Sequence, residues 1–373
     1  MDVIAYGIPV MDLLINIDHG LAPNESIDIN QTSWQYGGKV STGLVATKLL
    51  CDCECSMAGT TGGMFGRLIR REFERHGIDI SHLRHEEDTD SQFCVCLSVL
   101  SDSTRNIMVR RSTVPNYTPE EIRAQSAFIQ SASYVFLADS KPYSIEVGKV
   151  THEGYGKVVY DADRYYDEGM PEMLAECDYL IASEFVYRHL FGQSQDWEKN
   201  LRQMRTMCRP GAVVVVTLGE NGLVGLDETG FFKLPAFRVE VVDTTGAGDV
   251  FHGAFLAGLI QGMNVREACK YASAAAAIKC TRIGGRAGIP SEQVCKAFME
   301  TGKIDYTEID KRVAYYRDPP RGAMLLFFMK CVGRKNQESK SIFAHCGHKP
   351  SKISRCAVTL QPILRAVWST CSM

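Results

Sequence analysis

The sequence predicts a single α/β domain with a central, mostly parallel β-sheet, helices on both faces of that sheet and a small additional β-sheet. From Tyr117 onward, apolar runs of strand length alternate with segments of helix length. Such alternation is typical of a parallel sheet covered on both faces. Residues 13–36 instead hold short alternating stretches broken by Gly and Pro, which favours a hairpin or a small separate sheet. A content of 45% apolar and 23% charged residues is that of a globular protein.

The first third of the chain supplies the opening strand, the small additional sheet and the first helix. Residues 3–8 are apolar enough for a strand buried on both faces, and the small sheet is expected at about 13–36. Gly37-Gly38-Lys39 then opens a helix over about 40–50. The two glycines would let a ligand approach the backbone closely, although a tight turn from the small sheet to the helix needs them too. Paired strands are also expected within 93–110.

The middle of the chain is expected to build the rest of the sheet. Helices are predicted at about 118–131, 144–154, 184–191 and 195–208, and strands at 134–138, 157–160, 178–181 and 212–217. Ligands of such sheets bind beyond the carboxyl ends of the strands. Asp139, Asp161 and Asp163 each follow a predicted strand, so they belong either to a ligand site or to ordinary strand-end turns.

The most informative stretch is Asp243-Thr244-Thr245-Gly246-Ala247-Gly248-Asp249. Residues 237–242 before it alternate as a strand would, and Val250 to Ile260 after it has the length and apolar spacing of a buried helix. A glycine-rich turn at a helix start offers free N–H groups and the positive end of the helix dipole to an anion. Asp249 is therefore either an N-cap or a base that faces a substrate.

This stretch, continued through Phe251, Ala254 and Phe255, resembles the C-terminal signature of the ribokinase-like (PfkB) carbohydrate kinases. The resemblance covers about residues 1–305 and implies a ribokinase-like fold, in which residues 13–36 and 93–110 form a small β-lid that covers the sugar. It implies that Gly246, Ala247 and Gly248 form an anion hole for the transferred phosphoryl group. It also implies that Asp249 takes the proton of the attacking sugar hydroxyl, and phosphoryl transfer mainly needs positioning, charge stabilisation and one proton acceptor.

The same resemblance implies a sugar site near the N-terminus. Asp12 lies where these kinases carry an Asp that binds sugar hydroxyls, and Gly37-Gly38-Lys39 resembles their N-terminal signature, with Thr42 in place of an Asn. Asp139 corresponds to a sugar-contacting acidic position. Val10 stands where these enzymes often carry an Asn, which weakens the case for ribose itself as the substrate.

For the cofactors, the resemblance implies ATP, Mg²⁺ and a possible K⁺ site. The ATP contacts carried over are Thr217, Gly219, Gly222 and Ala275. The family's N-x-x-E motif, which organises magnesium, is replaced at Ser183 and Val186, which leaves Glu184 as the nearby carboxylate for Mg²⁺ or as a helix-end charge. A monovalent cation would lie near Asp243, Thr245 and the loop that starts at Thr281.

Charge and cysteine content limit the functions and the cellular setting that the sequence allows. The net charge of −3 argues against general nucleic-acid binding. No secretory signal or membrane-length apolar run is seen, and 14 Cys without a signal suggest free thiols in a reducing, cytoplasmic setting. The alternating Cys51, Cys53 and Cys55 fit a strand better than a zinc site. Residues 317–373 carry a net charge of +8 against −11 for the rest, which predicts a kinase domain over 1–310 and a separate, disordered or foreign tail over 317–373.

The sequence therefore predicts an ATP-dependent phosphotransferase that acts on a hydroxyl of a small sugar. Two alternatives stay open. A nucleoside kinase would need an aromatic pocket in the lid, which Trp34, Tyr36 and Phe93 could supply. A catalytically weak relative that only binds sugar or nucleotide is suggested by the replaced N-x-x-E motif. A homodimer through the lid is expected, with no membrane or nucleic-acid partner.

Overall fold

The structure is a computed structural model that describes residues 1–99, 101, 104–165 and 168–318. The described residues all belong to one compact unit, Met1–Pro320. Apart from Arg317 and Asp318, the predicted basic tail lies outside them. Within the described part of the chain, no helix has both the length and the apolar character that crossing a bilayer requires.

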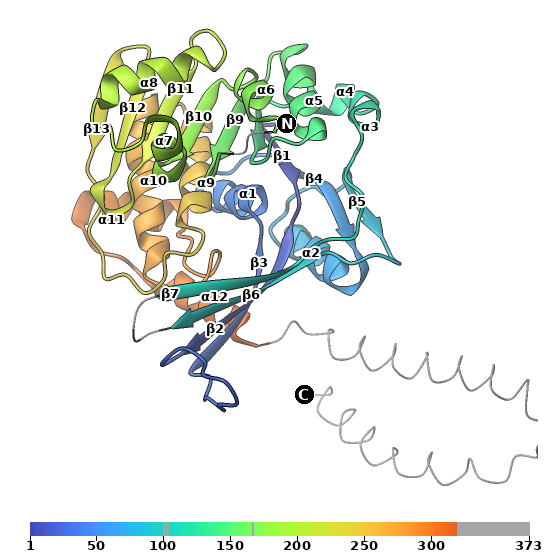
Figure 1. Ribbon diagram of the computed structural model, residues 1–373, viewed down its shortest axis with the longest axis vertical. Helices are drawn as coiled ribbons and strands as arrows, with labels where there is room; N and C mark the ends of the chain where they lie inside the picture. Colours follow the sequence, from blue (N-terminus) through green and yellow to red (C-terminus); the bar gives the residue numbers. More distant parts are fainter. Residues whose placement is uncertain (100, 102–103, 166–167, 319–373) are drawn as a thin grey trace, which may run out of the picture. The chain divides into compact units, whose positions relative to one another are not determined.

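A nine-stranded sheet forms the centre of this unit (Figure 1). In spatial order its strands are β13 (Gly230–Leu234), β12 (Leu223–Asp227), β11 (Val213–Thr217), β10 (Tyr179–Ser183), β9 (Lys157–Ala162), β8 (Tyr134–Leu137), β1 (Val3–Gly7), β4 (Cys55–Gly62) and β5 (Leu83–Glu86). Only β12 and β13 run antiparallel to their neighbours. The strands from β11 to β5 therefore present their carboxyl ends at one edge, where ligands of such sheets bind.

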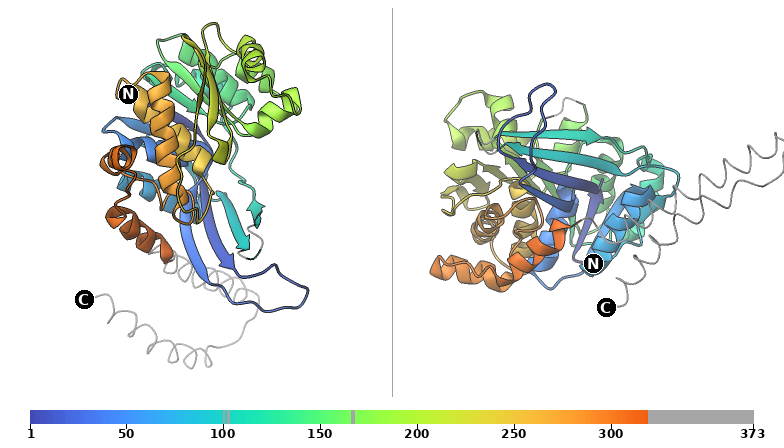
Figure 2. Two further views of the ribbon diagram at one scale, coloured as in Figure 1. Left: turned by 90° about the vertical axis from the view of Figure 1, so that its left-hand side faces the viewer. Right: turned by 90° about the horizontal axis from the view of Figure 1, so that it is seen from below.

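Helices cover both faces of this sheet, as the left view of Figure 2 shows. On one face lie α1 (Lys39–Leu50), α9 (Ala247–Ile260) and α10 (Val265–Cys280), which pack on one another. The other face carries α5 (Pro142–His152), α6 (Met170–Leu174), α7 (Glu184–Phe191) and α8 (Trp197–Thr206) over the main core cluster. The remaining described helices are α2 (Gly63–Arg75), α3 (Pro119–Arg123), α4 (Ser126–Ile129), the 3₁₀ turn η1 (Gly219–Asn221), α11 (Glu292–Thr301) and α12 (Thr307–Arg317). The predicted α/β fold with helices on both faces is confirmed.

A second sheet of four strands forms the lid. Its order is β3 (Gln31–Gly37), β2 (Val10–Ile17), β6 (Gln92–Val99) and β7 (Thr104–Arg110). Period-two alternation puts Asp12, paired with Gln35 and Cys94, on one face of this sheet. Every residue of the edge strand β7 is exposed.

Two expected elements differ: the helix expected over about 118–131 is divided into α3 and α4, and residues 237–242 form no strand. Val241 and Val242 are each 58% exposed. The backbone N–H groups of Val242 and Asp243 both donate to the carbonyl of Cys280, at 2.8 and 3.1 Å. The segment is thus held by the end of helix α10 instead of a sheet edge, and this satisfies its polar backbone without a ladder.

Helix α12 belongs to the same unit. Its Tyr316 is 1% exposed and donates to Oε1 of Glu72 at 2.5 Å. Arg75 donates to the same carboxylate from Nε and Nη2, at 3.0 and 2.6 Å. Burial opposes ionisation of Glu72, but these hydrogen bonds and the bond from His76 outweigh it and lower the pKa of Glu72 to about 2. The helix is therefore tied into the core by a buried polar cluster.

Candidate active site

The turn that begins helix α9 is open to a ligand. Gly246 is the N-cap and has a left-handed φ of 74°, which favours glycine. A Cβ on Gly246 would also lie 2.7 Å from Cα of Gly285, so the turn packs closely on the loop after α10. Gly248 is exposed, and no atom lies within 4 Å of the place its Cβ would take. The first turn of α9 thus leaves room for an anion beside its N–H groups.

Asp249 lies in this first turn and belongs to a cluster of acidic and basic side chains. It is partly exposed but surrounded by protein on most sides. Burial, followed by the nearby charge of Asp161, raises the pKa of Asp249 to about 8, although the Lys39 ammonium opposes the shift. Lys39, from the first turn of α1, forms an ion pair with Asp163. A carboxylate with a pKa near neutrality can exchange a proton with a hydroxyl at physiological pH.

His252 and Asp161, which the sequence analysis did not pair, lie beside each other next to this turn. His252 is 5% exposed and Asp161 is 3% exposed. Nδ1 of His252 lies 2.7 Å from the carbonyl of Gly248, and its Nε2 lies 3.2 Å from the carbonyl of Ile181 and 3.6 Å from Oδ1 of Asp161. Burial raises the pKa of Asp161, with His252 and Lys39 opposing. His252 therefore links the turn Gly246-Ala247-Gly248, called the anion turn below, to strand β10.

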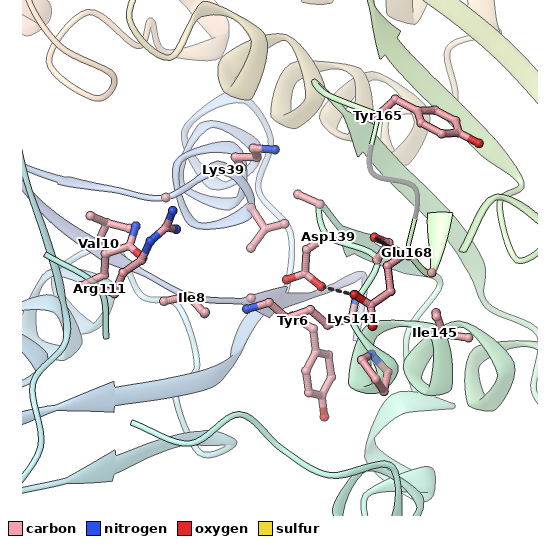
Figure 3. Close-up of a pocket in the computed structure, with 18 residues that line it drawn as sticks. Tyr6, Ile8, Val10, Lys39, Arg111, Asp139, Lys141, Ile145, Tyr165 and Glu168 are labelled. Atoms are coloured by element: carbon pink, nitrogen blue, oxygen red, sulfur yellow. Dashed lines mark hydrogen bonds between the residues drawn. The ribbon is translucent and has the colours of Figure 1, made fainter. Parts of the chain in front are cut away.

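The predicted sugar residues Gly38, Lys39 and Asp139 line one pocket of about 820 Å³ (Figure 3). Asp139 and Arg111 approach it from opposite sides. The Asp139 carboxylate accepts hydrogen bonds from the backbone of Lys141 (3.1 Å) and from the hydroxyls of Tyr143 and Ser144 (2.5 Å each). These bonds hold it at the start of α5 with its position fixed.

Asp12 and Gly37 lie against each other beside this pocket rather than in its lining. A Cβ on Gly37 would lie 1.8 Å from Oδ2 of Asp12, so the carboxylate occupies the space that the missing side chain leaves. Burial raises the pKa of Asp12 to about 6, while the charge of Arg286 and a hydrogen bond from the Cys94 thiol oppose the shift. The structure thus brings Asp12 to the lid-to-helix turn, on the lid face that carries Cys94.

The three aromatic residues of the lid lie on the opposite face. Trp34 stacks on Phe93 with ring centroids 6.5 Å apart, and Phe93 stacks on Phe65 of α2 at 5.1 Å. Tyr36 is buried and packs against Tyr316 of α12 at 6.3 Å. Since alternate residues of a strand face opposite sides of a sheet, these rings point away from Asp12. The rings of Phe93 and Tyr36 pack on α2 and α12.

The residues predicted to contact ATP differ in how accessible they are. Thr217 ends β11 and donates to the carbonyl of Ala182 at 3.4 Å, at the same edge of the sheet as Asp163. Gly219 has open space beside it, whereas Gly222 lies close to the backbone of Leu234. Ala275 is fully buried in α10. A direct contact between Ala275 and ATP would therefore require its neighbours to move.

Glu184 is the first residue of α7 and pairs with Arg188 one turn later, with Oε1 and Nη2 2.5 Å apart. Val186, at the place of the family's glutamate, is 1% exposed and packs in the core. Among the described residues, no group of three or more His, Cys, Asp or Glu is placed to hold a metal ion by itself. Mg²⁺ commonly needs only one or two carboxylates when substrate phosphates supply other ligands, which Asp163 and Glu184 fit.

A side chain of the lid contacts the segment that leads into the anion turn. Nη1 of Arg105, on β7, donates to Oγ1 of Thr245 at 2.5 Å. Oδ1 of Asp243 accepts bonds from the backbone N–H and the hydroxyl of Thr245, at 2.8 and 2.7 Å. Oδ2 of Asp243 accepts from the N–H of Gly284 at 2.7 Å. Asp243 and Thr245 therefore connect the anion turn with the lid and with the loop after α10 through hydrogen bonds.

An anion turn at the carboxyl edge of a parallel sheet, with a high-pKa carboxylate in the same helical turn and a pocket under a lid, defines a small-molecule phosphotransferase as the class of protein. The model of the pfkB family of carbohydrate kinases matches residues 2–292. The chain belongs to this family, and it is a carbohydrate kinase.

Individual relatives are distant. The ribokinase of Lactococcus lactis is 25% identical over 298 residues, which cover 79% of this chain and 96% of that protein. An ATP-dependent ribose-1-phosphate kinase of Halopiger xanaduensis is 27% identical over 269 residues, with 71% and 87% covered. The structure of Arabidopsis thaliana ribokinase, complexed with ribose and ATP, is 19% identical, with a TM-score of 0.69 and 80% and 98% covered. At that identity the structural likeness shows the fold alone.

Proposed function

We propose that this carbohydrate kinase transfers the γ-phosphoryl group of ATP to a hydroxyl of a small sugar. The observation that carries the proposal is the position of Asp249, a carboxylate in the same helical turn as the open Gly246-Ala247-Gly248 segment. A phosphoryl group held by these N–H groups would lie next to the carboxylate that must receive the hydroxyl proton.

In this mechanism Asp249 is the general base. The attacking hydroxyl gives its proton to the ionised carboxylate as the new O–P bond forms and the bond to the ADP oxygen breaks. Because burial and Asp161 raise the pKa of Asp249 to about 8, its conjugate acid holds that proton more readily than an ordinary aspartic acid would. Lys39 is placed to oppose excess negative charge around the reacting groups, since it already pairs with Asp163.

ATP is proposed to lie along the carboxyl ends of β10 and β11, beside Thr217, Gly219 and Gly222, towards Ala275. Magnesium, when bound, would neutralise charge on the phosphate oxygens. Glu184 and Asp163 are the partly exposed carboxylates at this edge, at 35% and 43% exposure, and either would reach the metal directly or through water. Each has a cationic partner, so the metal would compete with Arg188 and Lys39.

The acceptor is proposed to be a sugar, which Asp12, Gly37, Gly38, Lys39 and Asp139 would position. Three cationic side chains, Lys39, Arg111 and Lys141, line the pocket together with Asp139 and Glu168. This composition suits a polar sugar. The nucleoside alternative gains no support from Trp34, Tyr36 and Phe93, because their rings lie on the face of the lid opposite Asp12.

The proposal is tested by ADP formation with magnesium and ATP across neutral sugars, sugar phosphates, sugar acids and nucleosides. We expect one sugar to stimulate ADP release far above the rate with ATP alone. Stimulation by nucleosides alone would replace sugar by nucleoside as the acceptor. Tight binding of a sugar, measured by calorimetry, with no ADP formed would favour a binding protein that has lost turnover with its N-x-x-E motif.

A further inference from the structure

The last turn of helix α10 carries a lysine with no exposed surface. Lys279 is 0% exposed and is among the largest fully buried side chains among the described residues. Its Nζ donates to the backbone carbonyl of Asp243 at 2.6 Å. Burying an ammonium is costly unless nearby groups compensate it, so a lysine held there needs a reason beyond packing.

Asp243, whose carbonyl accepts this hydrogen bond, also holds the loops around the anion turn through its carboxylate. The Asp243 carboxylate binds Thr245 and Gly284, and Gly246 follows within the same turn. Burial works against ionisation of Asp243, but the Lys279 charge and the hydrogen bonds outweigh it, and the pKa of Asp243 is lowered. A positive charge on Lys279 thus acts on the segment that leads directly into the proposed phosphoryl site.

This is the place where the sequence resemblance permits a monovalent cation, near Asp243, Thr245 and the loop after Thr281. The residues present do not fit a free ion well. The Asp243 carboxylate oxygens already accept bonds from Thr245 and Gly284, and its carbonyl accepts the Lys279 ammonium. An ion bound to the same carbonyl would lie within a few ångströms of Nζ, where two positive charges repel strongly in a poorly solvated site.

We propose that the Lys279 ammonium is a tethered replacement for the monovalent cation, so that the enzyme works without K⁺. It holds the Asp243 carbonyl and supplies one positive charge beside the anion turn, as a bound ion would. An ammonium group resembles K⁺ in charge and approximate size, and it can donate to several oxygens. The effect of Lys279 on the reaction rate rests on the proposed kinase activity. The effect of Lys279 on K⁺ binding does not depend on that activity.

The first test uses the unmodified protein. Sugar-dependent ADP formation and the thermal midpoint Tm are measured in KCl, NaCl and choline chloride at a constant ionic strength of about 0.1 M. We expect rates within about twofold of one another and no specific shift of Tm by K⁺. A rate that rises on the order of tenfold or more in K⁺ would overturn the proposal.

The second test compares Lys279→Met with Lys270→Met, which removes an exposed lysine from the same helix. Without K⁺, Lys279→Met should lose on the order of tenfold or more of its rate, and K⁺ or NH₄⁺ should restore part of it. K⁺ should also raise the Tm of this variant by roughly 2 °C or more, and Lys270→Met should match the parent in every salt. A folded Lys279→Met with parental rate and no response to K⁺ would contradict the inference.

The Tm arm separates this inference from the proposed function. If no sugar supports ADP formation, the kinase proposal fails, and the effect of K⁺ on the Tm of Lys279→Met still decides the cation question. If the parent is an active kinase but is stimulated and stabilised by K⁺, only the role of Lys279 fails.

Discussion

Replacing the proposed base should make the protein more stable at neutral pH. Folding raises the pKa of Asp249 to about 8, while an unfolded Asp titrates near 3.9. Between these values the carboxyl binds more protons in the folded state than in the unfolded state, so its contribution to the free energy of unfolding falls as the pH rises from about 4 to about 8. Asp249→Asn removes this penalty because an amide does not titrate.

The size of the effect follows from the shift. At about 1.4 kcal/mol per pKa unit, a shift of about four units corresponds to roughly 6 kcal/mol at most. Asp249 is partly exposed and shares its charge environment with Asp161, so we expect a gain of roughly 1–3 kcal/mol at pH 8. At pH 4 the two proteins should have nearly equal stability.

The assay is denaturant unfolding of the full chain at pH 4, 6 and 8, with Asp88→Asn, in an exposed position, as the matched control. A helix N-terminus generally favours a negative side chain. If Asp249 served only that purpose, the Asn variant would be equal or less stable at pH 8. That result would refute the electrostatic account of this carboxylate.

Three further changes test other parts of the account. Glu184→Ala should raise the magnesium concentration needed for half-maximal rate several-fold and leave the sugar KM nearly unchanged; an unaltered magnesium titration would leave Glu184 as a helix-end charge. A chain cut after Arg317 should keep its Tm, whereas a cut after Lys303 removes the buried Tyr316 and should lower the yield of folded protein; equal stability of the two would show that α12 adds nothing. Ile107→Lys, at a residue 49% exposed on the edge strand β7, should turn a lid-mediated homodimer into a monomer in light scattering, and a parent that is itself monomeric would exclude the dimer.

Much of the fold could be predicted because its elements follow local patterns. Buried parallel strands appear as apolar runs, and the glycine turn at Gly246 has few alternative structures. The strand expected over 237–242 was wrong because alternation reports a pattern of exposure but not a pairing partner. The backbone N–H group of Val242 donates instead to the carbonyl of Cys280, at the end of α10. A pattern within one segment cannot predict such a contact between distant parts of the chain.

The same limit applies to the site. Asp161 and His252 are 91 positions apart in the chain and come within 3.6 Å only in the folded protein. The i, i+4 spacing of Gly248 and His252 could have indicated the bond between those two residues. Lys279 could also have been recognised in the sequence, because it is a charged residue in a buried, alanine-rich helix. The side of the lid that bears Trp34 follows from alternation, but which side faces the substrate depends on the register of the whole sheet.

The central claim is that Asp249 accepts the hydroxyl proton during phosphoryl transfer. The most direct measurement is the turnover of Asp249→Asn at saturating ATP and saturating sugar. Asn has nearly the same size, but it is no proton acceptor. We predict a folded variant that binds ATP and turns over on the order of 10²–10⁴-fold more slowly than the parent. A turnover within a few-fold of the parent would contradict the assignment of Asp249 as the base.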